Sequence, residues 1–177
     1  MQQPFYFKRV IIDNYSDIIS EVRAHVLSQD WTDKFGWHTI NAAALLDACP
    51  TIRQFFARHK MVLRLAGIII MRPQGSNAIH IDWVQDEFSK LALNMDILNC
   101  ETVKTRFFYT DSAIEFARNP AGVPYCRFPA DAKFTPVAAY DLSTPVLLDT
   151  QQPHQVRNTQ DRTRISISFR FFTDPDL

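Results

Sequence analysis

His80 and Asp82 are the residues whose types and spacing first suggest chemistry in this sequence. They flank Ile81 in a short segment, 78–83, that follows a Pro- and Gly-containing stretch at 73–77. Successive side chains of a β-strand point to opposite faces, so in a strand this imidazole and this carboxylate would share one face. Such a pair can supply two of the three protein ligands of a metal centre. The pattern is short and common, so the prediction depends on a third ligand elsewhere in the chain.

A third ligand is available at His154, far from the first two in the sequence. Two histidines and one carboxylate on one face of the ion, with the opposite positions open, are typical of mononuclear non-haem iron centres. We therefore predict that His80, Asp82 and His154 are metal ligands and catalytic residues. The remaining histidines fall in the part of the chain that we expect to be helical, and we discount them: His25, His38 and His59.

A candidate anion-binding group follows His154 in the last apolar segment of the chain. From Arg164 to Arg170 every second residue is Arg or Ser, and the residues between them are Ile or Phe. Arginine offers a planar fork of donors that matches a carboxylate, and Ser166 would lie on the same strand face as Arg164. An edge strand with one solvated face is the alternative. The histidines upstream favour a binding role for Arg164 and Ser166.

Composition sets limits on the class of protein. The chain has 177 residues, 46% of them hydrophobic, which is typical of a folded domain. The 19 basic and 19 acidic residues cancel, so neither nucleic acid nor an anionic membrane is favoured as a partner. The three cysteines show no paired spacing and are expected as free thiols. The N-terminal residues lack signal-peptide features and the longest apolar run, 61–71, is too short to span a bilayer, so we expect a cytoplasmic protein.

The elements that must position these residues change in character near residue 60. The first part predicts a strand at 5–12, a helix with Ile18 and Val22 on its apolar face, and two short helices, one capped by Asn41 and one at 51–58. The aromatic stretch 30–38 is interpreted as a loop. Its aromatic residues, with one more further on, could line a pocket or belong to the core: Trp31, Phe35, Trp37 and Trp83.

The second part consists of short apolar or alternating segments separated by turns. About eight strands are expected, at 61–71, 78–83, 91–98, 102–110, 133–141, 146–149, 153–157 and 163–172. The stretch 111–132 is interpreted as a connection with a helical turn near 114–116. We therefore predict one mainly β domain over 1–177, in which a helical N-terminal part (1–60) packs outside a jelly-roll core (61–172).

The combined pattern resembles a known family. His80-x-Asp82, His154 and Arg164-x-Ser166 are similar to the H-x-D…H…R-x-S pattern of Fe(II)/2-oxoglutarate-dependent oxygenases. The surrounding residues look most like the aspartyl/asparaginyl β-hydroxylase-like branch, over about 50–172. The resemblance implies a double-stranded β-helix (a cupin-like jelly roll), with Fe(II) held by the three ligands. It also implies 2-oxoglutarate and O2 as co-substrates.

In that family the arginine pairs with the far carboxylate of 2-oxoglutarate, which here implies Arg164 assisted by Ser166. Asn94 and Arg106 are further candidates for contacts with 2-oxoglutarate or substrate. The activity implied is hydroxylation of an amino-acid or peptidyl side chain with release of succinate and CO2. The substrate is thus a small molecule or a peptide, and the oligomeric state stays open. The alternatives are a non-oxidative cupin-like metal-binding protein or isomerase, and a jelly roll with a structural role alone.

Overall fold

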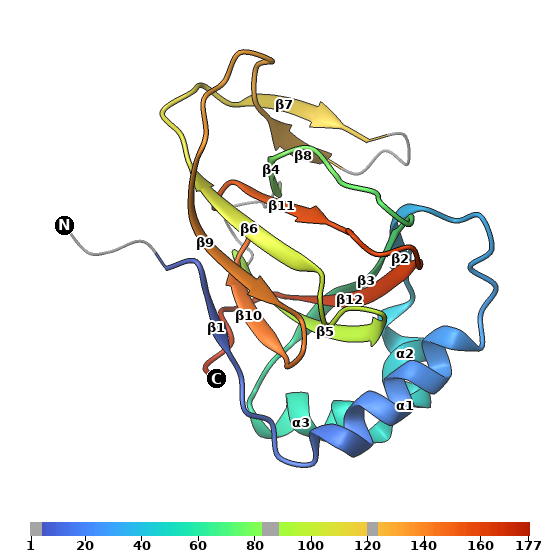
Figure 1. Ribbon diagram of the computed structural model, residues 1–177. Helices are drawn as coiled ribbons and strands as arrows, with labels where there is room; N and C mark the ends of the chain where they lie inside the picture. The colour runs from blue at the N-terminus through green and yellow to red at the C-terminus, as the bar shows by residue number, and fades with distance from the viewer. Residues whose placement is uncertain (1–4, 83–88, 120–123) are drawn as a thin grey trace.

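The computed structural model describes residues 5–82, 89–119 and 124–177 (Figure 1). Within them the chain forms three helices, which are α1 (Tyr15–Leu27), α2 (Ala42–Ala48) and α3 (Pro50–Arg58). It also forms twelve strands: β1 (Phe7–Arg9), β2 (Gly36–Ile40), β3 (Leu63–Met71), β4 (His80–Asp82), β5 (Leu91–Leu98), β6 (Lys104–Tyr109), β7 (Glu115–Arg118), β8 (Pro124–Arg127), β9 (Thr135–Asp141), β10 (Val146–Asp149), β11 (His154–Arg157) and β12 (Arg164–Phe171).

The strands pair into two six-stranded antiparallel sheets. The order in the first sheet is β1-β10-β5-β12-β3-β2, and in the second sheet it is β7-β8-β4-β11-β6-β9. Strands that are distant in the sequence are neighbours in both sheets, as in a double-stranded β-helix. Figure 1 shows the three helices gathered beside the first sheet, on the side away from the second. The prediction of a mainly β jelly roll with helices packed outside is confirmed.

The apolar face of β12 holds the helices in place. Ile165, Ile167 and Phe169 are buried in a core that also contains side chains of α1, α2 and α3. The ring of Phe56, from α3, meets the ring of Phe169 edge-on with centroids 5.2 Å apart. Because side chains alternate along the strand, the polar residues of β12 point the other way, into the space between the sheets.

The helices follow from local sequence signals. The apolar residues of α1 recur at helical spacing, and the four that are buried are Ile18, Ile19, Val22 and Val26. The side chain of Asn41 accepts a hydrogen bond from the backbone N–H of Ala44 and so caps α2, as predicted. Pro50 occupies the first turn of α3, where its missing N–H is not needed. None of the helices in the described residues is long and apolar enough to cross a membrane.

Two stretches that were expected to be loops or connections contain strands. Gly36–Ile40, whose first residues were assigned to a loop, forms the edge strand β2 and pairs with β3. Glu115–Arg118 and Pro124–Arg127 form a hairpin, β7 and β8, where a connection with a helical turn was expected. β8 also pairs with β4, so the hairpin is joined to the second sheet by a strand that is distant in the sequence. The strand predicted at 5–12 is present as β1, and β1 and β2 both belong to the first sheet.

Candidate active site

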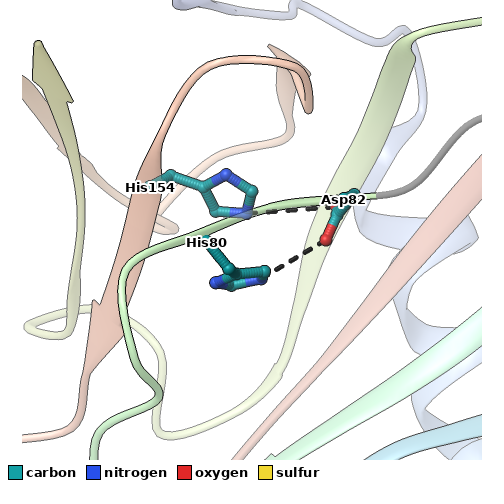
Figure 2. Close-up of side chains that lie close together, drawn as sticks. All are labelled: His80, Asp82 and His154. Carbon is teal, nitrogen blue, oxygen red and sulfur yellow. Dashed lines mark ion pairs between the residues drawn. The ribbon is translucent and has the colours of Figure 1, made fainter. Parts of the chain in front are cut away.

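The structure brings His80, Asp82 and His154 together at adjacent strands of the second sheet. His80 and His154 face each other directly across the β4–β11 pair, with ring centroids 4.4 Å apart. The Nε2 atom of His80 lies 3.3 Å from Oδ1 of Asp82, and the Nε2 atom of His154 lies 3.9 Å from Oδ2 (Figure 2). One ligand atom from each residue lies within 4.8 Å of the others, a spacing suited to a single metal ion.

Both imidazoles are oriented by the backbone two residues earlier. The Nδ1 atom of His80 lies 3.0 Å from the carbonyl oxygen of Ala78, and that of His154 lies 2.9 Å from the carbonyl oxygen of Gln152. A carbonyl oxygen only accepts, so each Nδ1 carries the proton and donates it. Each Nε2 faces Asp82. In the neutral His154 this atom presents the lone pair that a metal ligand needs, whereas protonated His80 donates its Nε2–H to Asp82 and must lose that proton to bind an ion.

The charges of the site are set by burial and by Arg170. Burial alone would raise the pKa of Asp82, but the Arg170 guanidinium, 2.6 Å from Oδ2, and the hydrogen bond with His80 hold it well below its usual value. Burial and the neighbouring His80 lower the pKa of His154 to about 4. Burial also acts to lower the pKa of His80, but its hydrogen bond and charge interaction with Asp82 outweigh this and raise it. At neutral pH the site thus holds an ionised carboxylate beside a neutral His154.

Arg164 lies deeper in the same interior, on the polar face of β12. Only 2% of this residue is exposed, and its Nε and Nη1 atoms have no hydrogen-bond partner within the described part of the chain. The same is true of four neighbouring polar atoms, the hydroxyls of Ser166, Ser168 and Tyr140 and the amide oxygen of Asn94. Buried donors without partners cost free energy, so a cluster of them indicates a place for a polar ligand.

Tyr140 reaches this cluster from the second sheet. It lies opposite Thr105 in the β6–β9 pair, and burial raises the pKa of its phenol, while Thr105 and then Arg164 act to lower it. The phenol therefore stays protonated and can donate to an anion near Arg164. Sequence reasoning missed Tyr140. The alternation of 135–141 could have placed it on the same face as Ala138, which also packs inside.

One cavity of about 450 Å³ joins the two groups. Its lining includes the three candidate ligands together with Asn94, Arg164, Ser168 and Arg170. Ser166 is buried between Arg164 and Ser168 on the same strand face but does not itself line the cavity. Phe35 and Trp37 line its outer part, whereas Trp31 packs against the core beneath the first sheet. Trp83 lies outside the described residues.

Arg106 does not reach the cavity. Its side chain is exposed on β6, whose inward-facing residues are Thr105 and Phe107. β6 also belongs to the second sheet, whereas Asn94 lies on β5 of the first sheet, so the two are not on neighbouring strands. The structure therefore gives no support to the expected contact between Arg106 and a co-substrate, because its side chain points to the exposed face of β6.

Solved structures with the same fold are known. No protein-family model and no curated protein matches the sequence. Among solved structures, the chain resembles SnoK, a non-heme alpha ketoglutarate dependent carbocyclase from nogalamycin biosynthesis, with a TM-score of 0.57, 10% identity and coverage of 94% of this chain and 80% of that one. The chain has the fold of that enzyme.

Two further structures have the same architecture. A prolyl-4-hydroxylase from Pseudomonas putida gives a TM-score of 0.52 at 14% identity, covering 94% of this chain and 92% of that one. The epimerase SnoN, in complex with Fe3+, alpha ketoglutarate and nogalamycin RO, gives a TM-score of 0.58 at 11% identity, covering 94% and 78%. The three enzymes carry out different reactions, so the shared fold leaves the reaction of this chain to be argued from its own site.

Proposed function

We propose that the protein is an Fe(II)- and 2-oxoglutarate-dependent dioxygenase that hydroxylates an unactivated C–H bond of an amino-acid or peptidyl side chain. One observation supports the proposal: a His-Asp-His cluster and a buried arginine with unpartnered donors line the same cavity. The reaction would consume the substrate, O2 and 2-oxoglutarate, and release the hydroxylated substrate, succinate and CO2. The aspartyl/asparaginyl β-hydroxylase-like branch stays our first expectation for its relatives.

The donor set fits iron. Two imidazole nitrogens and one carboxylate are the ligands that mononuclear non-haem iron(II) enzymes use, and His80, Asp82 and His154 would hold the ion. Asp82 is ionised and His154 is neutral before any ion binds, so His80, whose pKa is raised, is the ligand that would release a proton to the metal-bound state. A carboxylate has about four lone-pair sites, so Asp82 can serve Arg170 and a metal together. Bound iron would supply the site where O2 is reduced as 2-oxoglutarate is decarboxylated.

The deep end of the cavity fits the far carboxylate of 2-oxoglutarate. Arg164 presents two unpartnered donors, Nε and Nη1, on different edges of its guanidinium. A carboxylate can bind in bidentate fashion across the side edge, through Nε and Nη2, or across the end edge, through Nη1 and Nη2. Ser168 and Tyr140 add hydroxyl donors that also lack partners within the described residues. Satisfying these buried donors would recover the free energy that their burial costs.

Ligand binding under anaerobic conditions tests the proposal before any substrate is known. Fe(II) and 2-oxoglutarate added together should give a weak visible charge-transfer band, which His154→Ala removes and Arg164→Ala weakens by raising the concentration of 2-oxoglutarate required. A wild-type protein that gives no band would refute the proposal. A band that survives His154→Ala would refute the ligand assignment.

Turnover then separates the reaction classes. A screen of amino acids and peptides with Fe(II) and O2 should show succinate formation that depends on substrate. A non-oxidative metal protein, such as a cupin-like isomerase, would bind metal but form no succinate, and Arg164→Ala would leave its turnover unchanged.

A further inference from the structure

The outer part of the cavity carries an arginine that the proposed chemistry does not use. We call this part the outer chamber and define it by Phe35, Trp37, Arg72 and Tyr125, all of which line the cavity. They come from three places in the fold: the start of β2, the end of β3 and β8. The chamber is thus built by both sheets and lies on the route to the His-Asp-His cluster, whose residues line the same cavity.

Trp37 forms a fixed apolar wall of the outer chamber. Its ring lies against the backbone of β3 at Gly67, where a Cβ atom would come within 2.0 Å of the ring. Its Nε1 atom donates a hydrogen bond to Oγ1 of Thr39 at 3.2 Å. The ring also lies under the guanidinium of Arg170, 5.6 Å from its centroid. A side chain with three such restraints is held in place before any substrate arrives.

The charges lining the cavity do not balance. Among its described lining residues there are three arginines and one carboxylate, Asp82. Arg170 pairs with Asp82, and Arg164 lies at the deep end with the unpartnered hydroxyls. This leaves Arg72, which has no carboxylate within 4.0 Å among the described residues.

Arg72 is nevertheless held in a defined position. Its guanidinium stacks over the ring of Phe35, 4.3 Å from the ring centroid. Stacking uses the face of the guanidinium and leaves the N–H groups in its plane available, so the fork can still receive an oxyanion. The aromatic platform also reduces the conformational entropy that the arginine would lose on binding.

We propose that the outer chamber selects a substrate with a carboxylate that pairs with Arg72 and an apolar or aromatic body that packs against Trp37 and Tyr125. This inference rests on the proposed function, because it takes the cavity to be the substrate site of an oxygenase. It narrows the substrate from amino-acid or peptidyl side chains in general to small molecules or peptides that keep a free carboxylate near the side chain to be oxidised. Arg72 is then a specificity-determining residue, separate from the groups that bind metal and co-substrate.

Binding of matched small probes tests the inference without turnover. The probes are 3-phenylpropionate, its neutral amide 3-phenylpropionamide, and phenyl phosphate, titrated by saturation-transfer NMR. Each is measured with metal-free protein and, without oxygen, with protein saturated with Mn(II) and 2-oxoglutarate. We expect the carboxylate to bind more tightly than the amide, and Arg72→Gln to weaken carboxylate binding about tenfold while leaving amide binding unchanged. Arg72→Lys, which keeps the charge but loses the fork, should fall between the two.

The control variant is Arg162→Gln, which removes the same charge from an exposed side chain outside the cavity. It should bind all three probes as the wild type does. With the site at Arg164 filled by 2-oxoglutarate in the presence of Mn(II), equal affinity for acid and amide, or carboxylate binding that survives Arg72→Gln, would overturn the inference. Arg72-dependent binding of phenyl phosphate alone would also overturn it, since the substrate would then carry a phosphate. If the carboxylate binds through Arg72 but 2-oxoglutarate does not bind with Mn(II), the proposed function fails and the carboxylate site stands.

Discussion

Replacing Arg170 by Met should show how strongly the candidate ligand Asp82 depends on its neighbour. The ion pair between them is 2.6 Å long, and the side chains are only 13% and 24% exposed. Methionine keeps most of the length of the arginine but removes its charge and its donors. Asp82 would then be an ionised carboxylate in a largely buried place, with His80 as its remaining close polar partner.

The expected cost follows from this burial. Breaking a buried ion pair by removing one partner costs about 3–5 kcal/mol, and partial exposure together with the hydrogen bond from His80 should bring the loss towards about 3 kcal/mol. For a chain of this size that corresponds to a fall in Tm of roughly 6–12 °C. A divalent ion such as Mn(II) would supply positive charge beside Asp82 again. Its stabilising effect should therefore be larger in Arg170→Met than in the wild type.

The direction of the pKa shift of Asp82 determines how the free energy of unfolding depends on pH. The pKa of Asp82 is depressed in the folded wild-type protein, so its contribution to stability is complete above the unfolded pKa of about 3.9 and is lost as the pH falls through the folded value. Arg170→Met raises the folded pKa of Asp82. The difference in stability between wild type and variant should therefore be greatest near neutral pH and shrink below about pH 4.

Thermal and urea unfolding of the metal-free proteins, followed by circular dichroism between pH 3 and pH 8, would measure these differences. Arg162→Met is the matched control, because it removes an arginine whose side chain is 74% exposed and should change the stability by less than about 0.5 kcal/mol. A variant Arg170→Met that is as stable as the wild type at pH 7 would refute the reasoning. So would a stability difference that does not depend on pH.

Three further predictions follow from the same interior. Tyr140→Phe should leave the stability of the ligand-free protein unchanged or raise it slightly, because it removes a buried hydroxyl that lacks a partner within the described residues, yet weaken 2-oxoglutarate binding about fivefold in the anaerobic titration. Gly67→Ala should destabilise the protein by about 1–3 kcal/mol in urea through its collision with Trp37, and the double variant Gly67→Ala/Trp37→Leu should recover part of that loss. Phe56→Ala should cost about 3–5 kcal/mol of unfolding free energy, since it opens the core between α3 and β12.

Alternation along a single strand explains why much of the site could be predicted from the sequence. His80 and Asp82 share a face because they are two residues apart, and the same rule puts Arg164, Ser166 and Ser168 on one side of β12. On β12 the polar face points inward because the Ile and Phe residues between the polar ones are buried against the helices. The fold could be predicted for the same reason, as most of its strands carry a clear apolar period.

The features that the sequence did not predict depend on pairing between segments that are distant in the chain. β7 and β8 have weak patterns of their own, and their stability comes from each other and from β4. The exposure of Arg106 could not be predicted locally, because Thr105 and Phe107 face inward on β6 only once the first sheet covers that side. The ion pair between Arg170 and Asp82 joins the two sheets, and no local signal in either segment indicates that they meet.

The two faces of β12 contribute to the stability of the fold and to the candidate active site. Its apolar face anchors the helices, and its polar face carries Arg164 at one end and Arg170 at the other. Their Cα atoms are six positions apart, about 20 Å along an extended strand. One arginine thus lies beside Asp82 and the other beside buried hydroxyls that lack partners within the described residues. Any slip of β12 by two residues would keep its core face apolar and yet move both arginines by about 7 Å, so the register with β3 and β5 matters more for function than for burial.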